Sequence, residues 1–109
     1  MADKLLVVIT SGKEDKQKAI LGLMFSLHAT VETKVILFGP SETLVAENDQ
    51  DATPLIKQLM DKNIIPVACT NYADGNKLTD KLLAMNLKLK PVGPLISDYV
   101  REGYVTMTF

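Results

Sequence analysis

One side chain in this sequence combines nucleophilic chemistry with a position at the end of a strand. Cys69 is the single cysteine; it follows the apolar run 64–68 and precedes Thr70 and Asn71. A thiol at a helix N-terminus loses its proton more readily, and the thiolate is the reactive form. Free cysteines are also common as small buried hydrophobes. The position of Cys69 alone therefore leaves a reactive and a structural role open.

The ends of three other predicted strands carry small or turn-forming residues. These are Ser11 and Gly12 after the first strand, Gly39 after the second and Gly93 after the fourth. In open parallel sheets, ligands bind beyond the carboxyl ends of the strands. We therefore predict a small crevice around Cys69, in which backbone N–H groups of these residues and of Thr70 and Asn71 bind an anion. A plain strand-to-helix turn explains the range 10–13 more simply than an anion-binding nest.

The sequence gives no sign of a metal or an organic cofactor. One cysteine and one histidine exclude zinc clusters and C-x-x-C redox motifs. No G-x-G-x-x-G follows a strand, which argues against dinucleotide binding. The acidic stretch 47–51 opens like a calcium loop, but Ala52 replaces the required glycine and Gln58 the required glutamate. We therefore expect neither a bound metal nor a cofactor.

Composition predicts one globular domain covering residues 1–109. Hydrophobic residues make up 47% of the chain and charged residues 23%, with a formal net charge of −1. Lysines and arginines are spread along the chain, so no basic footprint for nucleic acid is present. The longest apolar run, 19–25, is too short to span a membrane, and the run 5–9 is too short for a signal peptide. We expect a cytoplasmic protein that contacts neither nucleic acid nor membrane.

Strand and helix patterns alternate along the chain. Apolar or alternating runs predict strands at 5–9, 35–38, 64–68, 87–92 and 104–109. Helical spacing or caps predict helices over 20–31, from Thr53-Pro54 onward, over 78–85 and over 94–102. Pro66 lacks an N–H group and fits the start or edge of a strand. This alternation predicts an α/β fold of three α/β/α layers around a mostly parallel five-stranded sheet.

Two stretches give the chain a family resemblance that covers nearly its whole length. They are the Ile-Pro-Val-Ala-Cys run ending at Cys69 and the closing Gly-Pro-Leu-Ile … Glu-Gly-Tyr stretch from Gly93 to Tyr104. With the order of the strands around them, the chain resembles the DsrE/DsrF-like family, which includes the TusD-type sulfur-relay proteins. The resemblance implies a parallel five-stranded fold that forms homo-oligomers. It also implies that the cysteine after the third strand, here Cys69, accepts and passes on persulfide sulfur.

Two hypotheses of function follow. In the first, the protein is a sulfurtransferase or persulfide carrier that uses Cys69 as the sulfur-accepting thiolate. With one cysteine it cannot resolve its own persulfide, so a sulfur donor or acceptor, protein or small thiol, is required. In the second, the protein is a non-catalytic module that binds a small anionic ligand or a protein partner, and Cys69 only lines the crevice.

A second apolar ridge beside the predicted core face of the first helix indicates a homo-oligomer. Leu21 and Phe25 lie one turn apart on that ridge, next to His28. The last strand adds an apolar face with Val105, Met107 and Phe109. Together these surfaces approach what a stable interface needs, so we expect Phe25 to contact a second copy of the chain.

Overall fold

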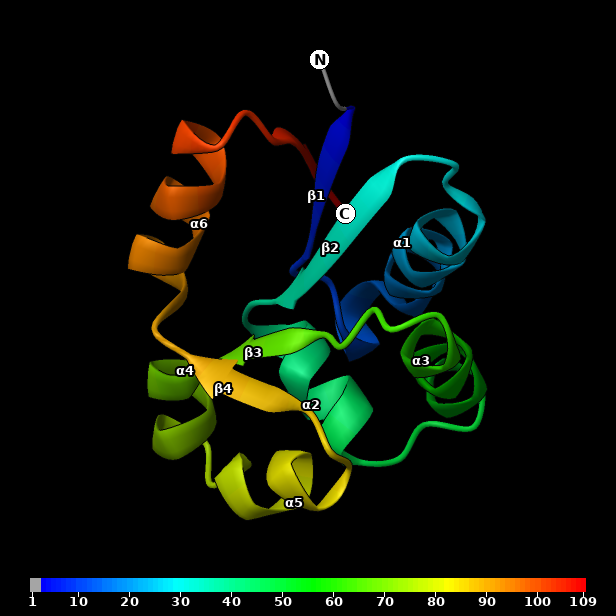
Figure 1. Ribbon diagram of the computed structural model, residues 1–109. Helices are drawn as coiled ribbons and strands as arrows, with labels where there is room; N and C mark the ends of the chain where they lie inside the picture. The colour runs from blue at the N-terminus through cyan, green and yellow to red at the C-terminus, as the bar shows by residue number, and fades with distance from the viewer. Residues whose placement is uncertain (1–2) are drawn as a thin grey trace.

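Five parallel strands form the centre of the molecule, as the computed structural model of residues 3–109 shows (Figure 1). The strand order is β4-β3-β2-β1-β5, and every neighbouring pair is parallel. The strands are β1 (Lys4–Ile9), β2 (Glu32–Leu37), β3 (Val67–Cys69), β4 (Lys88–Lys90) and β5 (Val105–Thr108). The predicted α/β class with a five-stranded parallel sheet is confirmed.

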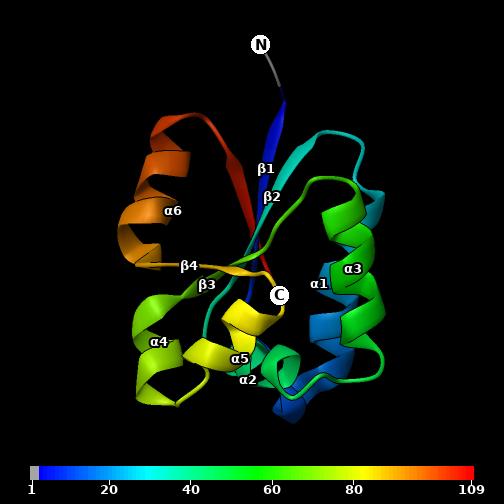
Figure 2. The same cartoon turned by 60° about the horizontal axis from the view of Figure 1, so that its bottom comes forward.

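Helices cover both faces of this sheet. They are α1 (Lys16–His28), α2 (Pro40–Ala46), α3 (Ala52–Asp61), α4 (Thr70–Gly75), α5 (Thr79–Ala84) and α6 (Val92–Arg101), with a 3-10 turn η1 (Lys13–Asp15) before α1. Figure 2 shows α1 and α3 on one side of the sheet and α4 and α6 on the other. The chain moves outward from β1 to β4 and then crosses back to β5. The right-handed crossover from β4 back to β5 runs opposite to those from β1 to β2 and from β2 to β3, so α6 lies on the face opposite to α1 and α3.

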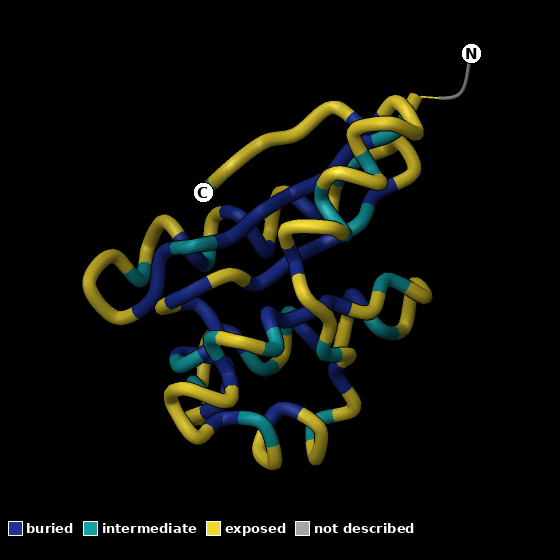
Figure 3. Tube along the Cα trace, turned by 90° about the vertical axis from the view of Figure 1, so that its left-hand side faces the viewer, coloured by how far each residue is buried: buried dark blue, intermediate teal, exposed yellow. Residues whose placement is uncertain are grey.

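The two faces of β1 supply two apolar clusters. Val7 and Ile9 pack with residues of α1 and α3, whereas Leu6 and Val8 pack with residues of α6 and with Tyr104. The buried backbone runs through the middle of the molecule in Figure 3, while the segment that leads to the C-terminus is exposed. This segment is β5, an edge strand whose four residues are all exposed. β1 is therefore covered on both faces, and β5 is the least covered strand.

The helical spacing over 20–31 predicts a buried stripe of Ile20, Leu23, Met24, Leu27 and Val31, of which Leu23 and Leu27 are buried. Met24 is 44% exposed, and Val31 lies outside the helix and is also exposed. The small residues Gly22 and Ser26 lie on the buried face of α1 instead. A Cβ atom on Gly22 would lie 2.9 Å from Cγ of Phe109, so only glycine lets Phe109 pack at this place. Helical periodicity predicts that larger apolar side chains form the buried face of α1, whereas close packing of the C-terminal residue requires smaller ones there.

Several predicted boundaries shift for local reasons. The helix predicted from Thr53 begins at Ala52, because the Asp49 side chain accepts the first N–H groups. Helix α2 was not predicted, since Gly39-Pro40 indicates a turn; the proline instead takes the first position of the helix, where its missing N–H costs nothing. Pro66 lies just before β3, so the sheet loses no hydrogen bond to it. Val100, predicted to face inward from α6, is exposed.

Within residues 3–109, the structure contains no helix that is both long enough and apolar enough to span a bilayer.

Candidate functional site

Cys69 is the last residue of β3, at the carboxyl end of the parallel sheet as predicted. It pairs in register with Lys90 of β4, while Ala68 lies opposite Leu37, the last residue of β2. Cys69 therefore lies just beyond the end of β2. Its side chain is 5% exposed and packs in the apolar cluster that includes Val92 at the start of α6.

A hollow of about 590 Å³ opens beside Cys69. Its walls come from the end of β2, from α4 and from the turn into α6: Phe38, Cys69, Asn71, Tyr72, Asn76, Pro91, Val92, Gly93 and Pro94. The hollow brings together three of the predicted site residues, Cys69, Asn71 and Gly93. No lysine or arginine is among its lining residues, so its polar groups are amides, a phenol and the thiol. The hollow suits a small, weakly charged group better than a strongly anionic ligand.

The other predicted site residues lie outside the hollow. The N–H groups of Thr10 and Ser11 both donate to the carbonyl oxygen of Phe109, at 2.7 and 3.3 Å. The N–H group of Gly12 donates to Oε1 of Glu14 at 2.8 Å. These N–H groups already have partners within the chain, which leaves none of them for an anion.

Thr70 and Gly39 have other positions as well. Thr70, half-buried, begins α4 and is not among the residues around the hollow. Gly39 directs its N–H group at the Glu42 carboxylate rather than toward the hollow. A site role for Thr70 or Gly39 thus stays a prediction that no contact of the hollow supports.

Glu42 is the main feature of this region that the sequence interpretation missed. It is fully buried in the first turn of α2. Its Oε2 atom accepts the N–H group of Gly39 at 2.9 Å, and its own N–H group donates to the Gly39 carbonyl at 2.9 Å. Its Oε1 atom has no hydrogen-bond partner among the described residues. The signal in the sequence was a glutamate shortly after Gly-Pro, which is typical of an exposed helix-capping residue.

Burial raises the pKa of Glu42 from its ordinary value of 4.5 to about 7. Removing a carboxylate from water disfavours its charged form, which is the largest effect here. The N–H groups of Gly39 and Cys69 oppose it and lower the pKa by a smaller amount. The Glu42 carboxyl group and Cys69 therefore meet at the point where β2 ends and β3 continues.

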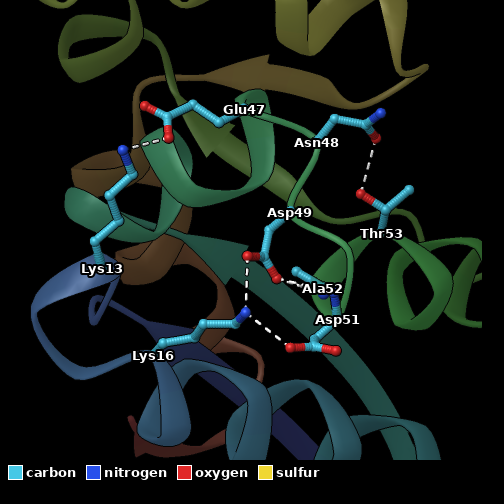
Figure 4. Close-up of polar contacts among 8 residues, drawn as sticks. All are labelled: Lys13, Lys16, Glu47, Asn48, Asp49, Asp51, Ala52 and Thr53. Atoms are coloured by element: carbon cyan, nitrogen blue, oxygen red, sulfur yellow. Dashed lines mark hydrogen bonds and ion pairs between the residues drawn. The ribbon is translucent and has the colours of Figure 1, made fainter.

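Lysines from η1 and from the start of α1 pair with the acidic loop that was compared with a calcium site (Figure 4). Nζ of Lys16 lies 2.9 Å from Asp49 and 2.7 Å from Asp51, and Nζ of Lys13 lies 2.5 Å from Glu47. Partial burial acts to raise the pKa of Asp49, but the contact with Lys16 lowers it. The contacts with Asp51 and Asp49 raise the pKa of Lys16. Within the part of the chain that the structure describes, no group of three or more His, Cys, Asp or Glu side chains is arranged to hold a metal ion.

Solved structures of other proteins have a fold similar to that of this chain. Neither protein-family models nor curated proteins match the sequence. A conserved protein of unknown function from Bacteroides thetaiotaomicron, BT1422, superimposes with a TM-score of 0.79 at 22% identity, over 98% of this chain and 95% of that one. The ychN protein of E. coli gives a TM-score of 0.76 at 12% identity, over 98% and 99% of the two chains. Both structures belong to the DsrE-like fold family.

This chain has the DsrE-like fold. At these identities the likeness concerns the fold alone. Within this DsrE-like sheet, the hollow beside Cys69 lies at the carboxyl end of β3, among the edges where open α/β sheets bind ligands.

Proposed function

We propose that this protein carries sulfur as a persulfide on Cys69. The observation that carries the proposal is the position of the single thiol, at the carboxyl end of a central strand and in the wall of a hollow large enough for a small sulfur donor. The DsrE-like fold and the resemblance of the sequence to sulfur-relay proteins support it. The activity is that of a sulfurtransferase without a cofactor.

The proposed chemistry consists of two thiol–persulfide exchanges, one that loads Cys69 with sulfur and one that passes the sulfur on. The Cys69 thiolate attacks the outer sulfur of a donor persulfide, R–S–SH. A bond forms between Sγ and that sulfur, the S–S bond of the donor breaks, and the donor leaves as a thiolate that takes up the proton lost from Cys69. The reverse exchange passes the sulfur to an acceptor thiol, so neither step needs an oxidant or a reductant. Because no second cysteine exists in the chain, the acceptor is a partner protein or a small thiol.

The shape of the hollow favours a compact donor. Cys69 is only 5% exposed, so the outer sulfur of the donor must enter the hollow to reach Sγ. The amide of Asn71, at the exposed edge, is placed to donate to a sulfur anion. Phe38 and Val92 add apolar contact. The alternative is a binding module in which Cys69 only lines the hollow; the absence of lysine and arginine from the lining argues against its version with a small anionic ligand.

Intact-mass measurement after incubation with a persulfide donor tests the proposal. The wild-type protein is expected to gain the mass of one or more sulfur atoms and to lose it on reduction, whereas Cys69→Ser gains none. Alkylation of the wild-type thiol by iodoacetamide, followed by mass, serves as the control for access. An accessible thiol with an unchanged mass after the donor would favour the binding module.

We also propose that the protein forms a homo-oligomer through the exposed surface beside β5. Val105 and Met107 point to the same side of the sheet as Phe109, whose ring lies 5.6 Å from that of Phe25. Leu21 extends this apolar surface along α1. An uncovered edge strand beside exposed apolar side chains is a surface that proteins commonly cover.

A further inference from the structure

The backbone N–H group of Cys69 connects the carboxyl group of Glu42 with the sulfur atom of Cys69. The N–H group of Cys69 acts on the carboxylate closely enough to lower its pKa, and Sγ of the same residue is three covalent bonds from that nitrogen. The carboxyl group is fully buried, and its Oε1 atom has no hydrogen-bond partner within residues 3–109. Because both side chains are buried, bulk water would not screen the carboxyl group from a negative charge on this sulfur atom.

No side-chain charge from the surrounding elements compensates Glu42. Charged groups on the elements packed against α2, and the acid that follows α2, are all exposed: Lys13, Glu14, Asp15, Glu47, Lys57, Asp61, Asp80 and Lys81. On α4, Asp74 is exposed and Tyr72 is half-buried. Only burial and the N–H groups of Gly39 and Cys69 act on the pKa of Glu42. Among the described residues, Cys69 is thus the titratable residue whose backbone N–H group acts on this carboxyl group.

We propose that Glu42 is the proton acceptor of Cys69: its carboxyl group takes up a proton whenever the sulfur atom becomes negatively charged. When the thiol ionises, one proton leaves Sγ and one is bound by the Glu42 carboxylate, so the net charge of the buried pair stays at minus one. The inference rests on the proposed function for its use, because a persulfide is more acidic than a thiol and makes the loaded Cys69 an anion near neutral pH. Loading Cys69 with sulfur would then leave Glu42 neutral.

Two chemical modifications of Cys69 that differ in charge test this coupling. Iodoacetamide adds a neutral group to the thiol, and iodoacetate adds a carboxylate of similar size. The titration of Glu42 is then followed through its side-chain ¹³C carboxyl signal, assigned with Glu42→Gln. We expect the midpoint to be higher in the carboxymethyl protein by about one pH unit, on the order of tenfold in proton affinity. Equal midpoints in the two adducts would overturn the proposal.

A second pair of proteins needs no alkylation. Cys69→Asp and Cys69→Asn have side chains of the same shape, and only the first carries an acid. The titration of Glu42 is expected to be raised or split in Cys69→Asp and to remain a single step in Cys69→Asn. A single step with the same midpoint in both variants would count against the proposal. Backbone amide spectra of the two variants establish that they are folded.

The effect of the Glu42 carboxylate on the thiol can also be measured directly, through the rate at which Cys69 is alkylated. In Glu42→Gln the thiol can ionise without a neighbouring carboxylate having to bind a proton, so iodoacetamide is expected to react faster at about pH 8, on the order of tenfold. Glu47→Gln removes an exposed carboxylate just after the same helix and is expected to leave the rate unchanged. Identical rates in wild type and Glu42→Gln would also overturn the coupling. None of these measurements involves sulfur transfer, so a failed sulfur-loading test and a failed proton coupling are distinguishable.

Discussion

A rise in pH is expected to destabilise this protein through one side chain, Glu42. Its pKa is about 7 in the folded chain and 4.5 where it is unperturbed. Between these values the folded state binds more protons than the unfolded state. The stabilisation is therefore complete below the unfolded pKa and is lost as the pH rises through the folded one. At about 1.4 kcal/mol for each pKa unit, the free energy of unfolding falls by about 3 kcal/mol in total.

That loss is large beside the 5–15 kcal/mol that is usual for a whole domain, at roughly a quarter of it. It is measured by urea unfolding, followed by circular dichroism, at several pH values from about 5 to about 8. The comparison is with Glu42→Gln, which keeps an oxygen acceptor for the Gly39 N–H group but does not titrate. Relative to wild type, the variant is expected to become more stable by about 2–3 kcal/mol across this range.

The difference between wild type and variant removes the contribution of every other titrating group. Glu47→Gln is the matched control: its carboxylate is exposed and paired with Lys13, so its difference from wild type is expected to stay nearly constant from pH 5 to 8. If the curves of wild type and Glu42→Gln run parallel, then the buried carboxyl group titrates normally. Both its predicted effect on stability and the reasoning from burial would then be refuted.

Three further substitutions test packing, capping and assembly. Gly12→Ala places a Cβ 2.3 Å from the Pro40 carbonyl oxygen and is expected to cost about 1–3 kcal/mol of stability in urea unfolding, whereas Gly75→Ala, with open space around it, costs little. Asp49→Ala removes an acceptor of two N–H groups at the start of α3 and is expected to lower stability by about 1 kcal/mol, with Asp49→Asn close to wild type. Phe25→Asp is expected to shift an oligomer toward monomer in sedimentation without unfolding it; if the wild type already sediments as a monomer, the interface is wrong and the variant should instead lower Tm.

The succession of the five strands along the chain, and the place of Cys69 at the end of the third, could be predicted from the sequence. Continuous β-branched runs mark strands that are covered on both faces, and glycine or proline marks where each one stops. These are local properties, because they depend on a residue and its near neighbours in the chain. Cys69 directly follows such a run, so its position at a carboxyl end follows from the sequence as well.

Features that depend on contacts between distant segments could not be predicted. The buried face of α1 is decided by Phe109, which packs on Gly22 from the far end of the chain. The same residue accepts the N–H group of Ser11, which was predicted to bind an anion. In each case the partner lies more than 80 positions away, and helical periodicity carries no information about it.

Glu42 shows the same division within the candidate site. Its sequence context, a glutamate in the first turn after Gly-Pro, is a local signal for a helix cap, and Glu42 caps α2 although this helix was not predicted. Whether the capping carboxylate faces water or protein depends on where α2 docks. In this fold α2 packs against η1, α3 and α5, so the carboxyl group is enclosed beside Cys69. The local sequence favours the capping hydrogen bond, and only the tertiary structure removed the water that would have kept the acid ionised between about pH 4.5 and pH 7.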